Sequence, residues 1–128
     1  MKLLLDTVTF LRASLGKAEL SPRARDLILD ESNERYLSTV SSWEIAIKYS
    51  LGSLPLPEAP DRFLPRHREA MAVQSLPLDE ESALHVVRLP QLHRDPFDRM
   101  LICQAIVGGM VLVTPDALVT QYPVRSAW

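Results

Sequence analysis

Short apolar runs alternate with segments of helical spacing along this chain. The run KLLL at residues 2–5 is continuously apolar, which is typical of a strand buried on both faces of a parallel sheet. Further short strands are predicted at RYLSTV (35–40), VQSLPL (73–78) and MVLVT (110–114), with an edge strand at PVRSA (123–127). No internal repeat interrupts this alternation.

Helix signals fill the intervals between these strands. Ser21-Pro22, Ser41 and Asp79 are N-cap candidates, and Asp95-Pro96 begins the strongest helical pattern, which ends at Gly108. The predicted helices cover residues 8–14, 22–31, 42–51, 61–71, 80–89 and 96–107, with a short helix near Asp116. Strands that alternate with helices in this way predict an α/β sandwich with a central, mostly parallel sheet.

Length and composition set the class of protein. At 128 residues with 47% hydrophobic positions, the chain is expected to form a single domain over 1–128 that buries its own core. Cys103 is the only cysteine, so it predicts a small core residue and neither a disulfide nor a zinc site. The first apolar run is too short for a signal peptide and no later run spans a bilayer, so we expect no membrane contact and a soluble, cytoplasmic protein.

Four acidic residues lie where a strand or turn leads into a helix: Asp6, Glu44, Asp98 and Asp116. In parallel sheets, ligands bind beyond the carboxyl ends of the strands, so these four side chains are expected to converge at one edge. Clustered carboxylates repel one another unless a divalent cation with oxygen ligands neutralises them. The pattern therefore predicts a metal-dependent hydrolase, and a bound cation would offset the net charge of −2, which weakly opposes nucleic-acid binding.

Each acid also has an ordinary structural interpretation. Ser41 and Glu44 match the capping box S-x-x-E, which contributes about 1 kcal/mol. Asp98 suits a helix dipole, and Asp116 suits a turn or cap. Asp6 is harder to explain, because an acid directly after a buried strand is costly unless it has a partner. Four independent caps need not all fall on one edge of the sheet, so the set of four acids in this order favours a functional role.

Four segments resemble those of a known family. LLLDT, SSWEIAIK, HRDPFDRMLICQA and LVTPD, in this order, are similar to the motifs of PIN domains, specifically the VapC-type ribonuclease toxins of toxin-antitoxin pairs. The resemblance implies a PIN-like α/β/α sandwich and an endoribonuclease that uses Mg²⁺ or Mn²⁺ to cut RNA. It also implies a cognate antitoxin that inserts a segment near the acidic cleft, and a homodimer. One departure is Val8, where many relatives carry a histidine after the Asp-Thr pair.

The resemblance assigns the direct metal contacts to Asp6 and Asp98, while Glu44 and Asp116 complete the site through water or a second ion. Other candidates to support the acids or contact the substrate are Thr7, Ser41, Lys48, Asp95, Arg94, Arg99 and Thr114. His93 is interpreted as a surface or loop histidine. Trp43 and Trp128 are predicted to serve core packing or partner contacts.

Two alternatives belong to other classes. A PIN-like scaffold without useful catalysis would act by binding RNA or protein, although the four retained acids oppose this. A phosphotransfer enzyme or phosphatase with Asp6 as nucleophile would need a second aspartate at the first strand, and Val8 occupies that position. Trapping of an acyl phosphate on Asp6 would support the second alternative.

Overall fold

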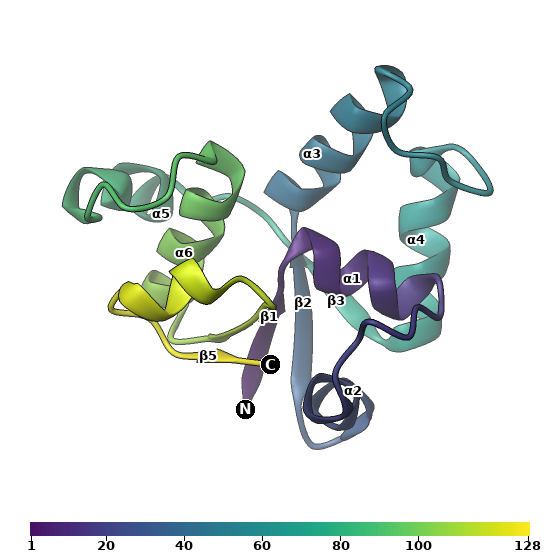
Figure 1. The fold of residues 1–128 in the computed structure, drawn as a ribbon, viewed down its shortest axis with the longest axis horizontal. Coiled ribbons are helices and arrows are strands. Elements are labelled where there is room, and N and C mark those ends of the chain that lie inside the picture. The colour runs from purple at the N-terminus through teal and green to yellow at the C-terminus, as the bar shows by residue number, and fades with distance from the viewer.

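Five parallel strands form one central sheet in the computed structural model, which describes all residues 1–128 (Figure 1). The strands are β1 (Lys2–Leu5), β2 (Glu34–Ser38), β3 (Val73–Leu76), β4 (Val111–Val113) and β5 (Ser126–Ala127). Their order across the sheet is β3-β2-β1-β4-β5, and every neighbouring pair is parallel. The prediction of an α/β sandwich is confirmed, and the sheet is parallel throughout.

Helices cover both faces of the sheet (Figure 1). They are α1 (Thr7–Ser14), α2 (Pro22–Leu29), α3 (Thr39–Ser50), α4 (Pro60–Met71), α5 (Glu80–His85) and α6 (Pro96–Gly108), with 3₁₀ helices η1 (Val86–Arg88) and η2 (Ala117–Gln121). Buried side chains of α1, α2 and α4 form a core on one face, and those of α6 form a second core on the other. The architecture is therefore an α/β/α sandwich.

The central strand β1 explains why both cores exist. Leu3 and Leu5 belong to one core and Leu4 to the other, and all three are fully buried. Successive side chains of a strand point to opposite faces, so a continuously apolar strand must be covered on both sides. Each fully buried leucine contributes about 1.5–3 kcal/mol relative to an exposed one.

Helix α3 begins earlier than the sequence predicted. Ser38, the last residue of β2, is its N-cap, and the Ser38 hydroxyl accepts the N–H of Val40 at 3.0 Å. The predicted strand at 35–40 therefore ends two residues too late, and the prediction that Ser41 caps the helix is wrong. Ser41 lies inside α3, so the capping box with Glu44 does not form. Hydroxyl side chains at Ser38, Thr39, Ser41 and Ser42 offered alternative caps, and the one at the strand end forms the cap.

Other predictions need smaller changes. The helix expected at 80–89 is divided into α5 and η1, and the helix expected at 22–31 ends at Leu29 because Asp30 adopts an extended conformation. Cys103 is buried in α6, as predicted, and this burial raises the pKa of its thiol. None of the helices combines the length and apolar character needed to traverse a bilayer.

Candidate active site

The candidate site lies at the carboxyl ends of the strands, where the order of the sheet reverses. Strands β1, β2 and β3 follow one another to one side, whereas β4 and β5 lie on the other side of β1. Asp6 directly follows β1, and Asp116 follows β4. This gap between β1 and β4 is a topological switch point, which is where open α/β sheets bind their ligands.

Asp6 is buried and held from two directions. It is the N-cap of α1, and its Oδ1 accepts the N–H of Thr9 at 2.7 Å. Burial raises the pKa of the Asp6 carboxyl, while hydrogen bonds from Thr114 and Thr9 oppose this shift. The side chain is 7% exposed, so the structure keeps a carboxylate in a place where its charge needs external compensation.

Glu44 projects from α3 toward the start of α1. Its Oε1 accepts the hydroxyl of Thr7 at 2.7 Å, and the Thr7 oxygen lies 2.9 Å from the hydroxyl of Ser41. Its Oε2 forms an ion pair with the Nζ of Lys48, which is half exposed. The hydrogen bond to Glu44 raises the pKa of Lys48. Glu44 therefore has partners for both oxygens, and Lys48 extends this pair toward solvent.

The Thr7 contact predicts the effect of a single substitution. Thr7→Val keeps the shape of the side chain but leaves the buried Glu44 Oε1 and the Ser41 hydroxyl without this partner. We expect the free energy of unfolding to fall by about 1–3 kcal/mol in urea titrations. Thr7→Ser retains the hydroxyl and serves as the control. Equal stability of the valine variant and the wild-type protein would contradict this role.

Asp98 lies in the first turn of α6, beyond the N-cap Asp95, whose Oδ1 accepts the N–H of Phe97 at 2.9 Å. Burial, followed by the charges of Asp95 and Glu44, raises the pKa of Asp98 to about 7, and Asp6 adds to this shift. The charges of three acids from separate elements thus all disfavour ionisation of the Asp98 carboxyl. Such mutual repulsion at a cleft is a physical signature of functional sites.

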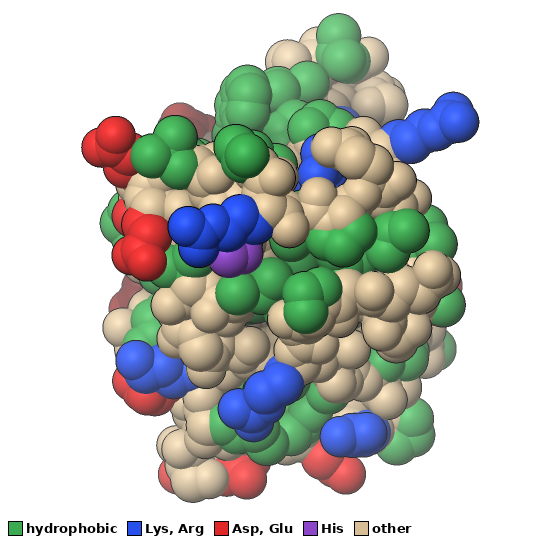
Figure 2. All heavy atoms as spheres, turned by 90° about the vertical axis from the view of Figure 1, so that its left-hand side faces the viewer, with side chains coloured by type: hydrophobic (Ala, Val, Ile, Leu, Met, Phe, Trp, Pro, Cys, Tyr) green, Lys and Arg blue, Asp and Glu red, His purple; other side chains and the backbone are tan.

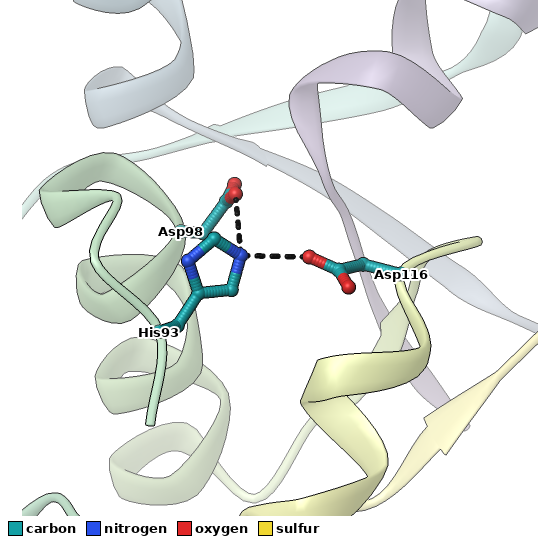
Figure 3. A group of neighbouring side chains, drawn as sticks. All are labelled: His93, Asp98 and Asp116. Carbon is teal, nitrogen blue, oxygen red and sulfur yellow. Dashed lines mark hydrogen bonds and ion pairs between the residues drawn. The ribbon is translucent and has the colours of Figure 1, made fainter. Parts of the chain in front are cut away.

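Three donor atoms form a tight group at this edge (Figure 3). The Nε2 of His93 lies 2.7 Å from Oδ2 of Asp116 and 3.3 Å from Oδ2 of Asp98, and the three atoms lie within 4.8 Å of one another. The ring of His93 is only 14% exposed. The interpretation of His93 as a surface residue is therefore wrong, although it does lie in the loop before α6. Asp6 and Glu44 do not belong to this tight group.

Thr114 lies beside both Asp116 and Asp6. The N–H of Asp116 donates to Oγ1 of Thr114 at 3.1 Å, and the Thr114 hydroxyl lowers the pKa of Asp6. Asp116 is also the N-cap of η2, where its Oδ1 accepts the N–H of Leu118 at 2.9 Å. A single threonine after β4 thus lies next to two of the four predicted acids.

The remaining candidates differ in their surroundings. Arg94 is exposed, whereas Arg99 is half buried and its Nε and Nη2 have no hydrogen-bond partner. Val8, where the family resemblance leads us to expect a histidine, is 43% exposed on α1. Trp43 is 62% exposed and packs edge-on against Phe97, so the core-packing interpretation of Trp43 is wrong. Trp128 packs against the core, as predicted.

Comparison with known proteins identifies similar sequences. A family model described as PIN domain matches residues 3–123. Ribonuclease VapC16 of Mycobacterium tuberculosis is 34% identical over 68 residues, which cover 53% of this chain and 48% of that protein. The match therefore spans about half the length of the curated relative.

Solved structures share the fold at low identity. VapBC2 from Rickettsia felis, bound to a DNA fragment from its promoter, gives a TM-score of 0.75 at 15% identity, covering 99% of this chain and 98% of that chain. DNA-bound VapBC from Salmonella typhimurium gives a TM-score of 0.68 at 23% identity, covering 99% of this chain and 97% of that chain. FitAcB from Neisseria gonorrhoeae gives a TM-score of 0.62 at 17% identity, covering 97% of this chain and 95% of that chain.

Proposed function

Because this chain belongs to the PIN domain family, we propose that it is a metal-dependent endoribonuclease that hydrolyses phosphodiester bonds of RNA. The partial similarity to Ribonuclease VapC16 supports the reaction and the substrate class. The observation that carries the proposal is the group of acids at the carboxyl ends of β1 and β4, where burial and the charges of neighbouring acids raise the pKa of Asp98. Carboxylates gathered in this way at a switch point are suited to a cation and to the phosphate that it attracts.

The donor set fits a hard divalent cation. Carboxylate oxygens dominate the site, and Mg²⁺ and Mn²⁺ prefer oxygen ligands. Asp6 and Asp98 would hold the ion directly, and Glu44 and Asp116 would act through water. When bound, the ion would lower the pKa of a water molecule and neutralise charge on the phosphate.

The protein's own groups prepare this site before any substrate arrives. Thr7 and Lys48 fix the Glu44 carboxylate, the N–H of Thr9 fixes Asp6, and Thr114 accepts the N–H of Asp116. Preorganised side chains of this kind reduce the reorganisation that the reaction requires. The half-exposed Lys48 and the exposed Arg94 are our candidates for contacts with RNA phosphates, whereas the unpartnered Nε and Nη2 of Arg99 are buried.

Metal removal tests the proposed activity. Purified protein is incubated with a total cellular RNA pool in Mg²⁺ or Mn²⁺, with a chelator, and again after the ion has been restored. We expect cleavage that the chelator abolishes and the ion restores, monitored by gel electrophoresis and end-mapping of fragments. Binding of RNA without cleavage under every condition would contradict the proposed ribonuclease activity and favour the scaffold alternative.

An antitoxin is the proposed partner, consistent with similarity to toxin-antitoxin complexes. A hollow of about 720 Å³ lies between α1, α2 and α4, and about half of its lining residues are hydrophobic. It lies beside the amino ends of β2 and β3, so this proposed contact is separate from the insertion near the acidic residues that the family resemblance implies. Four cations line it, Arg12, Lys17, Arg25 and Arg35, against the single acid Glu31. The complementary occupant is an amphipathic segment with acidic and apolar side chains.

Charge reversal at this hollow tests the partner surface. Lys17→Glu combined with Arg25→Glu should weaken binding of a fluorescent helical peptide, with glutamates on one face and leucines on the other, by at least about tenfold. Fluorescence anisotropy at two salt concentrations measures this effect. Arg23→Glu with Arg62→Glu is the matched control, since it reverses the same number of charges on α2 and α4 and neither residue lines the hollow. Equal weakening by both pairs would contradict a specific surface.

A homodimer is also proposed. Hydrophobic side chains are spread over the face that carries α5, η1 and α6 (Figure 2). Leu84 of α5 and Val87 of η1 are 63% and 84% exposed. Apolar exposure of this extent supports contact with a second copy. Light scattering coupled to size exclusion measures the molar mass, and a monomer at every concentration would contradict the proposal.

A further inference from the structure

We propose that His93 is a positioning residue whose Nε2–H holds the Asp116 carboxylate, so that this imidazole is a hydrogen-bond donor and never a metal ligand. The metal part of this inference rests on the proposed function, whereas the tautomer does not. Figure 3 shows the ring between the two aspartates, where its position alone is also compatible with a nitrogen ligand. The hydrogen bonds around the ring distinguish these roles.

The backbone of Asp95 selects the tautomer. Its N–H donates to Nδ1 of His93 at 3.1 Å. A peptide N–H can only donate, so Nδ1 must present a lone pair, and a neutral ring then carries its proton on Nε2. Nε2 is the nitrogen that faces Oδ2 of Asp116 at 2.7 Å. With its lone pair occupied by a proton, Nε2 donates to the carboxylate and has no electron pair left for a cation.

The main chain of His93 is held as firmly as its ring. Its N–H donates to the hydroxyl of Tyr122 at 2.7 Å, and Tyr122 is buried in the core beneath η2. His93 therefore joins the loop before α6 to the segment after β4 through its backbone and its side chain. A ring fixed in this way cannot turn toward an ion without breaking the Asp95 and Asp116 contacts.

The consequence for Asp116 is that both of its oxygens have donors. Oδ1 accepts the N–H of Leu118 at 2.9 Å, and Oδ2 accepts Nε2–H of His93. Asp116 is thus oriented to act on an ion through water, while Asp98 lies at the longer distance of 3.3 Å from Nε2. The site retains oxygen ligands alone, which favours Mg²⁺ and Mn²⁺ over Zn²⁺.

Nitrogen chemical shifts of ¹⁵N-labelled histidine test the tautomer directly. Long-range proton–nitrogen spectra of the wild-type protein should show His93 protonated on Nε2 and unprotonated on Nδ1, with the pattern unchanged by saturating Mg²⁺. Loss of the signal in His93→Gln assigns it. A proton on Nδ1, or a Mg²⁺-induced exchange of the two nitrogens, would overturn the proposal.

Two amide substitutions test the positioning role. The Gln side-chain amide can place an N–H where Nε2 lies, whereas the Asn amide reaches only the place of Nδ1. His93→Asn should weaken Mn²⁺ binding in calorimetry by about 10–100-fold, and His93→Gln should retain most of the affinity. Equal affinity of the two variants would overturn the role, with thermal unfolding confirming that each is folded.

These results separate the inference from the proposed function. The predicted tautomer and the Gln–Asn difference in a protein that cuts no RNA would leave the role of His93 intact and refute the nuclease. RNA cleavage in a protein whose His93 carries its proton on Nδ1 would support the nuclease and refute the role of His93. If the Asn variant does not fold, the spectra of the wild-type protein decide the matter alone.

Discussion

Replacing Asp98 by asparagine should lower metal-dependent RNA cleavage by at least about 10³-fold, which corresponds to about 4 kcal/mol of transition-state stabilisation. The same substitution should raise the thermal midpoint of the metal-free protein by a few degrees. Asp98 is the acid whose pKa burial and neighbouring carboxylates raise to about 7, so its charge destabilises the folded state when no cation is bound. Opposite effects on activity and stability identify a functional carboxylate.

Gel assays of RNA cleavage and calorimetric unfolding measure the two effects on the same samples. Asp26→Asn is the matched control, because Asp26 is exposed on α2 and its carboxylate has no hydrogen bond or ion pair. Asp6→Asn provides a second test, since asparagine also caps a helix well and should preserve α1. Full activity in both folded variants would mean that other residues hold the ion.

Stability of the metal-free protein should fall as the pH rises from about 5 to about 8. Between the ordinary aspartate pKa of about 4 and the folded value of about 7, the folded state binds more protons than the unfolded state, so its stability decreases with pH. Burial also raises the pKa of Asp6, so this carboxyl adds to the loss of stability at higher pH. The thermal midpoint should drop by about 5 °C or more across this window.

A divalent ion should remove most of the dependence of stability on pH, because a bound cation stabilises the ionised carboxylates. Calorimetric scans with Mn²⁺ and with chelator at each pH measure the difference, which should be largest near pH 8. Asp98→Asn should flatten the chelator curve, whereas Asp26→Asn should not. A thermal midpoint that rises with pH in chelator would contradict this interpretation of the acidic site.

The sequence predicted those elements whose signals are local. The apolar run before Asp6 and the Asp-Pro pair before α6 each define a boundary by their own chemistry, and the structure follows them. The start of α3 was missed because Ser38 and Ser41 are both good caps. Their choice depends on where β2 ends in the sheet, which no single residue specifies.

His93 shows the limit of sequence reasoning within the site. Its partner Asp116 lies 23 residues away, and their contact depends on how the loop before α6 meets the segment after β4. No spacing rule relates these two positions. The signal that was available is the proximity of His93 to Asp95 in the sequence, and the backbone contact between them sets the tautomer.

The place of β1 in the sheet has a consequence for synthesis. Residues 3–5 leave the ribosome long before residues 111–113, yet the two segments pair at the centre of the sheet. Asp6 and Asp116 can come together only after the segment that contains Asp116 has been translated. A nascent chain therefore carries an incomplete site, and the ribosome and message that produce it meet the proposed catalytic centre only after Asp116 has been synthesised.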